Sequence, residues 1–205
     1  MAEPVSARAS TPASVSASAS ASASASVSTS TSASVRTPPP ATALQLLRHA
    51  VATLAYRADK VLREVPVGFA ECRLTPSSRS AGEIVWHLGD LMAWGERLAR
   101  GEYRWDAGAP LPWPEAVHRF FRELAAFDAA LADPGIAPPP TDVLFQGPVA
   151  DALTHVGQLA LLRGLAGQPV RPESYARATI QTGRVGRDQA PPGREFDGDA
   201  SRPSR

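Results

Sequence analysis

Apolar side chains recur every three or four residues in several stretches between residues 41 and 169. In the first stretch, residues 41–66, they fall at Leu44, Leu47, Val51, Leu54, Ala58 and Val61. This spacing places them on one face of a helix of about six turns, because an α-helix has about 3.6 residues per turn. Pro66 should end this helix, since proline has no amide hydrogen to donate.

The second helix is predicted to begin at Ser80. The sequence Ser80-Ala81-Gly82-Glu83 is a capping box, in which the serine and glutamate side chains each bond a free backbone amide of the first turn. Gly101 should end the helix, because glycine readily takes the left-handed conformation that follows many helices. A third helix should start at Pro114, and its apolar stripe comprises Val117, Phe120, Phe121, Leu124, Phe127 and Leu131.

The fourth helix is predicted from about Pro148 to Ala166, followed by Gly167 and Pro169. Four amphipathic helices without a convincing strand predict an all-α fold, a four-helix bundle over residues 41–169. The connections on either side of the second helix are long enough to cross the bundle. The up or down direction of each helix therefore stays open at this level.

The two ends of the chain have a different composition. Residues 1–40 are almost entirely Ala, Ser, Thr and Val, and they predict a disordered tail, because so few large apolar groups cannot offset the entropy of the chain. Residues 170–197 have weak periodicity and many Arg and Gly residues, so we expect an extended segment that packs on the bundle. Residues 198–205 should form a frayed end.

Charge and cysteine content narrow the functional classes. The 205 residues are 43% hydrophobic and carry a formal charge of +1, with no clustered basic stripe, which argues against nucleic-acid binding. No apolar run is long enough to predict a membrane span, and the N-terminus lacks the pattern of a secretory signal. The single cysteine, Cys72, leaves a reducing compartment as the simplest expectation, and we predict a cytoplasmic protein.

Two of the four histidines fall on apolar helix faces, which makes them candidate ligands. His87 lies on the inner face of the second predicted helix and His155 on that of the fourth. Asp151 lies one turn before His155 and projects from the same face. Two histidines and one carboxylate are an ordinary ligand set for zinc, nickel or non-haem iron, with positions open to water or substrate. They can share an ion only if the imidazoles lie within about 6 Å, since the bonds are ~2.1 Å long.

Neighbouring side chains suggest how such a site is supported. Asp90, one turn after His87, is a candidate to orient that imidazole, as metal-bound histidines usually require, or it is a surface acid. We expect an apolar wall that excludes water, formed by Leu91, Trp94 and Leu159.

A metal-free interpretation of the same spacing remains open. His87 and His155 would then be hydrogen-bonded core residues, and Asp151 an acid favoured by the helix dipole. His49 and His118 are predicted on the surface, and Cys72 is a lone thiol without an obvious activating base.

The segments AGEIVWHLGDLMAWGERLARGEYRW, DALTHVGQLALLRGLAGQPV and GRVGRDQ resemble the DinB/YfiT-like superfamily of proposed metalloenzymes. The resemblance covers about residues 42–197, and its most specific element is His155-Val156-Gly157-Gln158. It implies a four-helix bundle, frequently a homodimer, that holds zinc or nickel through three histidines. Carried over to this chain, it implies ligands at His87 and His155, with Asp151 where the family has its remaining histidine.

The resemblance also implies an activity. Characterised relatives include transferases that use low-molecular-weight thiols and a thiol-dependent isomerase. It therefore implies a divalent metal that activates a small-molecule thiol for attack on an electrophile. Two alternatives stay open: a non-enzymatic, metal-free helical module for dimerisation or small-ligand binding, and iron-dependent oxygen chemistry at a facial triad.

Overall fold

The computed structural model describes residues 42–136 and 140–196. The predicted N-terminal tail, residues 1–40, and the predicted frayed end, residues 198–205, lie outside these ranges. Four long helices make up the described chain: α1 (Ala43–Leu62), α2 (Ala81–Ala99), α3 (Trp113–Ala132) and α5 (Ala150–Leu165). The described residues contain no strand, only one isolated bridge between Glu173 and Glu195. The all-α bundle predicted from the sequence is confirmed.

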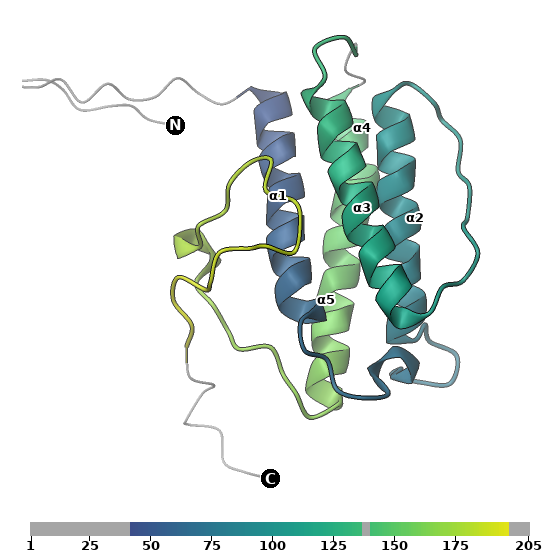
Figure 1. Cartoon of the computed structure of the whole chain (residues 1–205), viewed down its shortest axis with the longest axis vertical. Coiled ribbons are helices and arrows are strands. Elements are labelled where there is room, and N and C mark those ends of the chain that lie inside the picture. Colours follow the sequence, from purple (N-terminus) through teal and green to yellow (C-terminus); the bar gives the residue numbers. More distant parts are fainter. Residues whose placement is uncertain (1–41, 137–139, 197–205) are drawn as a thin grey trace, which may run out of the picture. The chain divides into compact units, whose positions relative to one another are not determined.

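The helices are arranged so that α1 and α2 each pack against both α3 and α5. Figure 1 shows that α1 and α5 run in one direction and α2 and α3 in the other. The connection between α2 and α3 therefore returns along the length of the bundle, and these two helices lie parallel with the most extensive contact of any pair. A glycine allows that closeness: a Cβ on Gly95 would lie 3.1 Å from the ring of Phe127.

Local signals fix where the first two helices begin. The capping box predicted at Ser80 is present, with the Ser80 hydroxyl accepting from the amide of Glu83 and the Glu83 carboxylate accepting from the amide of Ser80. Thr42 and Gln45 form a second capping box at the start of α1. At the other end of α2, Gly101 has φ 84°, as its predicted role requires.

The last helix begins earlier than the sequence predicts. Helix α4 (Thr141–Leu144) continues through a five-residue π-helical segment, η2 (Phe145–Val149), into α5 without a break. Pro148 was expected in the first turn of a helix, but it lies inside η2. A π-helix bonds residue i to i+5, and this local adjustment accommodates the missing amide of the proline.

Arg163 of α5 closes the C-terminal end of α1. The residue is only 9% exposed, and its guanidinium donates to the carbonyl oxygens of Val61 and Arg63 at 3.0 and 2.7 Å. It also donates to Gln168 at 3.2 Å. The last carbonyls of a helix have no partner within the helix, so the arginine satisfies groups that burial would otherwise leave unpaired.

The segment after α5 packs against α1, as expected. Glu173 is buried there: its carboxylate accepts from Tyr56 Oη at 2.6 Å and from Lys60 Nζ at 2.7 Å. Lys60 also pairs with Glu195, the residue that bridges to Glu173. The segment is held by polar contacts around one buried carboxylate.

No helix among the described residues is long and apolar enough to cross a membrane.

Candidate metal centre

His87, Asp151 and His155 come together where α2 packs against α5. Their possible ligand atoms all lie within 4.8 Å of one another. Asp151 Oδ1 is 3.4 Å from Nε2 of His155, and Asp151 Oδ2 is 3.8 Å from Nε2 of His87. The two imidazole rings meet edge to face with centroids 4.9 Å apart. This separation lies inside the limit of about 6 Å that sharing an ion imposes.

Gln158 sets the orientation of one of these rings. It lies one turn after His155, and its Oε1 atom is 2.8 Å from Nδ1 of the imidazole. An amide oxygen can only accept, so Nδ1 carries the hydrogen and Nε2 keeps its lone pair. That lone pair faces Asp151. The arrangement resembles the hydrogen bond by which a metal-bound histidine is usually held.

The surroundings of His87 favour its neutral form. Burial lowers the pKa of His87 from its ordinary value of 6.5, and the positive charge of Arg79 and the proximity of His155 lower it further. The carboxylates of Asp151 and Asp90 act in the opposite direction without reversing the shift. Only the neutral imidazole binds a metal ion, so the low pKa leaves His87 ready to bind at neutral pH.

Trp105 covers the outer side of His87. The indole belongs to the connection between α2 and α3, and its centroid lies 5.8 Å from the ring of His87 and 5.7 Å from that of Trp94. Trp94 was predicted beside the site, whereas Trp105 was not among the predicted site residues. A loop residue has no helical periodicity to mark it, so sequence reasoning had no signal for this contact.

Asp90 is buried, and its carboxylate accepts hydrogen bonds from residues other than His87. Its Oδ1 atom accepts from Arg119 Nη2 at 2.7 Å and from the amide of Gly108 at 3.0 Å. The hydrogen bond expected from Asp90 to His87 is therefore replaced by bonds to α3 and to the α2–α3 connection. Because that connection carries Trp105, Asp90 helps to hold the loop that covers His87.

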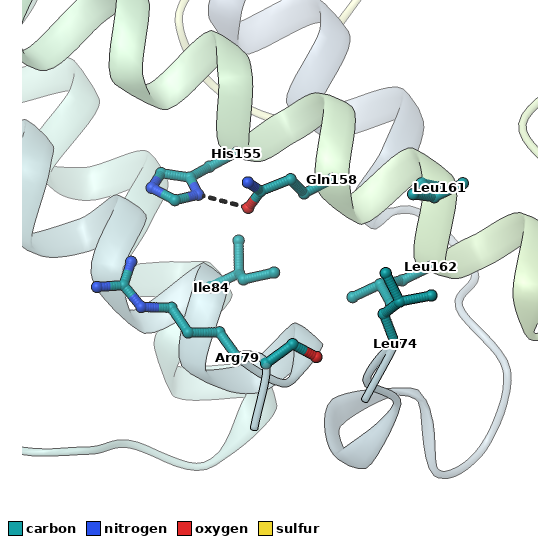
Figure 2. Close-up of a pocket in the computed structure, with 8 residues that line it drawn as sticks. Leu74, Arg79, Ile84, His155, Gln158, Leu161 and Leu162 are labelled. Atoms are coloured by element: carbon teal, nitrogen blue, oxygen red, sulfur yellow. Dashed lines mark hydrogen bonds between the residues drawn. The ribbon is translucent and has the colours of Figure 1, made fainter. Parts of the chain in front are cut away.

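Two of the three residues expected to form an apolar wall are buried in the core. Leu91 and Leu159 are 2% and 0% exposed and belong to the core of the bundle. A cavity of about 360 Å³ instead adjoins His155, on the side of Gln158. Figure 2 shows the two residues at one end of this pocket, with Ile84 of α2 beneath them. This pocket is lined by residues other than the three predicted for the apolar wall.

The donor set suits a divalent cation. A tetrahedral ion with bonds of ~2.1 Å holds its ligand atoms ~3.4 Å apart. The 3.4 Å between Asp151 and His155 matches this separation, and the 3.8 Å to His87 requires a small rotation of a ring. The Asp151 side chain is 45% exposed, so the group is accessible from solvent.

The remaining candidate residues lie apart from this group. His49 and His118 are exposed, as predicted. Cys72 is half-buried, and its thiol points to the carbonyl oxygen of Leu162 at 3.8 Å. Arg79, which the sequence did not single out, lines the pocket and influences His87.

The fold and the group of ligands define a class: an all-α, four-helix bundle with a His-Asp-His group that can hold a metal ion between two helices. No protein-family model, no curated protein and no solved structure matches the chain.

Proposed function

We propose that the protein binds one divalent metal ion through His87, Asp151 and His155. The observation that carries the proposal is the convergence of the three ligand atoms within 4.8 Å, from two helices. The bond from His155 Nδ1 to Gln158 supports it, because it leaves Nε2 free to bind. Nitrogen and carboxylate donors suit zinc or nickel best, with iron as the alternative.

We further propose that the ion serves a transferase that activates a low-molecular-weight thiol, as the resemblance to the DinB/YfiT-like superfamily implies. A divalent cation with open positions lowers the pKa of a small thiol and favours its thiolate. With such an ion held by His87, Asp151 and His155, the thiol would release its proton to solvent, its sulfur would bond an electrophilic carbon, and the leaving group would depart with its electron pair.

The side chains of this protein would prepare that reaction in distinct ways. Asp151 contributes one negative charge, so that a bound dication keeps a net positive charge to attract a thiolate. Trp105 covers His87 and limits access of water from that side. The cavity beside His155 leaves room for a substrate on the other side.

Metal content tests the first proposal. Protein purified without added metal, or reconstituted with zinc or nickel and then desalted, should carry about one ion per chain by elemental mass spectrometry. His155→Ala and His87→Ala should each lose it. The exposed histidines provide the matched control, since His49→Ala and His118→Ala should retain it. Equal metal content in all four variants would refute the site.

The thiol-transfer proposal needs a separate test. The metal-loaded protein should accelerate the reaction of small thiols with an aromatic halide, followed by the absorbance of the thioether product. His155→Ala should remove the acceleration. A stoichiometric metal without acceleration for any of a panel of thiols would refute the transferase while leaving the metal site standing.

A second candidate function is a metal-free helical module that binds a small ligand or dimerises. It is favoured by the position of Asp151, which lies within ion-pair distance of both imidazoles and can partner them without an ion. Metal-free protein that unfolds at the same temperature with and without excess zinc or nickel would favour this candidate.

A further inference from the structure

A pocket adjoins the candidate metal centre at His155 and lies between α5, the start of α2 and the connection that precedes α2. Its volume of about 360 Å³ falls in the range of sites that hold small molecules, about 300–1,000 Å³. His155 and Gln158 line it at one end (Figure 2), so whatever fills it lies against a candidate ligand of the metal.

The two ends of the pocket differ in chemistry. Figure 2 shows the guanidinium of Arg79 at the same end as the imidazole of His155, whereas Leu74, Leu161 and Leu162 gather at the other end. Ile84 lies between the two ends. A ligand that fits both ends must therefore carry a polar group at one end and an apolar body at the other.

The polar end of the pocket carries the positive charge of Arg79, which can bind a ligand. Within residues 42–136 and 140–196, Arg79 forms no ion pair, although nearby Arg73 pairs with Glu83. The guanidinium presents several N–H donors in a plane and matches a carboxylate with two parallel hydrogen bonds. Its charge also attracts an anion toward the end of the pocket where His155 lies.

The apolar end of the pocket exposes two large leucine side chains to solvent. Leu74 and Leu161 are 60% and 57% exposed, and they face one pocket. An apolar chain lying between them would cover surface that is otherwise in water, and the gain is roughly proportional to the area covered. A partly enclosed hollow with one charged end favours a small molecule over a second protein chain.

We infer that this pocket binds an amphiphilic organic carboxylate, with its carboxylate on Arg79 beside His155 and its apolar body between Leu74 and Leu161. The inference names the substrate class of the candidate metal centre and in that respect rests on the proposed function. The binding itself needs only the residues of the pocket, so it is measurable on protein that holds no metal.

The test compares hexanoate with hexanamide, which has the same apolar body and no charge. Titrations followed by amide chemical shifts, on chelator-treated and on metal-loaded protein, should show saturable binding of hexanoate, roughly two- to fivefold tighter than hexanamide, as for one accessible charge pair. Arg79→Ala should bring the two affinities together. Arg122→Ala, which removes an exposed arginine outside the pocket, should leave the preference unchanged.

A pair of leucines on α5 tests the apolar end. Leu161 and Leu165 are 57% and 56% exposed, but only Leu161 lines the pocket. Leu161→Ser should weaken both ligands about equally, whereas Leu165→Ser should weaken neither. Because both side chains are exposed, neither change should prevent folding, and circular dichroism checks this.

Several results would overturn the inference. They are an absence of saturable binding, equal affinities for the acid and the amide in the unmodified protein, or an Arg79→Ala variant that keeps the preference. Sedimentation that shows a dimer dissociated by Leu161→Ser would instead assign this face to self-association. Failure of the metal proposal is distinguishable from failure of this inference, because a protein that binds no metal could still bind hexanoate more tightly than hexanamide.

Discussion

His155 donates a hydrogen bond from Nδ1 to Oε1 of Gln158, one helical turn away, at 2.8 Å. The bond fixes which imidazole nitrogen has a free lone pair and holds the ring toward Asp151 and His87. An exposed glutamine thereby controls the geometry of a buried histidine.

Removal of this bond should weaken metal binding. In Gln158→Leu the imidazole is free to rotate and to change tautomer, so we expect the affinity for zinc to fall about 10- to 100-fold in competition with a chromogenic chelator. Gln158→Glu can accept the same hydrogen bond and should retain the affinity. An unchanged affinity in the leucine variant would show that Gln158 has no part in holding the ligand.

Gly108 should be required for the loop that covers His87. A Cβ at this position would lie 2.8 Å from Nη1 of Arg119 and would displace the guanidinium from Asp90. We expect Gly108→Ala to lower the free energy of unfolding by about 1–2 kcal/mol and to change the near-ultraviolet circular dichroism of the tryptophans.

Gly164 on α5 is the matched control for this change. Nothing lies within 4 Å of a Cβ there, so Gly164→Ala should stabilise the protein by up to about 1 kcal/mol, since alanine favours the helix. If both alanine variants behave alike, the contact between Gly108 and Arg119 is not what holds the loop.

The buried guanidinium of Arg163 should contribute strongly to stability. Arg163→Met leaves the carbonyl oxygens of Val61 and Arg63 without their donor, and we expect a loss of about 2–4 kcal/mol in urea unfolding. Lysine should restore only part of this loss, because one ammonium can replace Nη1, which bonds both Val61 and Arg63, but leaves the carbonyl of Gln168 without the donor that Nε supplies. Arg122→Met, at an exposed position, should change the stability by less than about 0.5 kcal/mol.

Glu173 should make part of the stability depend on pH. Burial alone would raise the pKa of its carboxyl, but the hydrogen bonds from Lys60 and Tyr56 outweigh burial and bring the pKa below 4.5. As the pH falls, the Glu173 carboxyl is therefore protonated at a higher pH in the unfolded chain than in the folded one. Its contribution to the free energy of unfolding is complete above about pH 4.5 and is lost as the pH falls through the lower pKa of the folded state.

Glu173→Gln should remove that dependence. We expect the variant to lose about 2–4 kcal/mol at pH 7 and to show a flatter decline in stability between about pH 5 and pH 3 than the unmodified protein. Glu102→Gln, in an exposed loop, is the control and should keep the steep decline. A steep decline retained in Glu173→Gln would place its origin in other carboxylates.

Local signals in the sequence predicted much of the fold. The capping box at Ser80 and the glycine at 101 mark the ends of α2 because both act within a few residues. Likewise, the four-residue spacing of Asp151 and His155 places both on one helix face. The approach of His87 to them could be anticipated only as a hypothesis, because it depends on how two helices pack.

The features that the sequence did not predict depend on tertiary contacts or on irregular backbone. Pro148 was assigned to a first turn because proline is common there, whereas the chain places it in a π-helical segment. Asp90 bonds Arg119, 29 residues away, and no periodicity connects the two. Trp105 and Arg79 belong to loops, whose course is decided by the helices that they join.

The π-helical segment η2 changes the rotation of α4 about the helix axis relative to α5. One residue inserted into a regular α-helix rotates the part before it by about 100° relative to the part after it. The face that α4 presents is therefore uncoupled from the face on which Asp151 and His155 lie. A single-residue deletion within Phe145–Val149 would regularise the backbone and swing Thr141–Leu144 around the axis, while the registry of α5 against α2 stays in place.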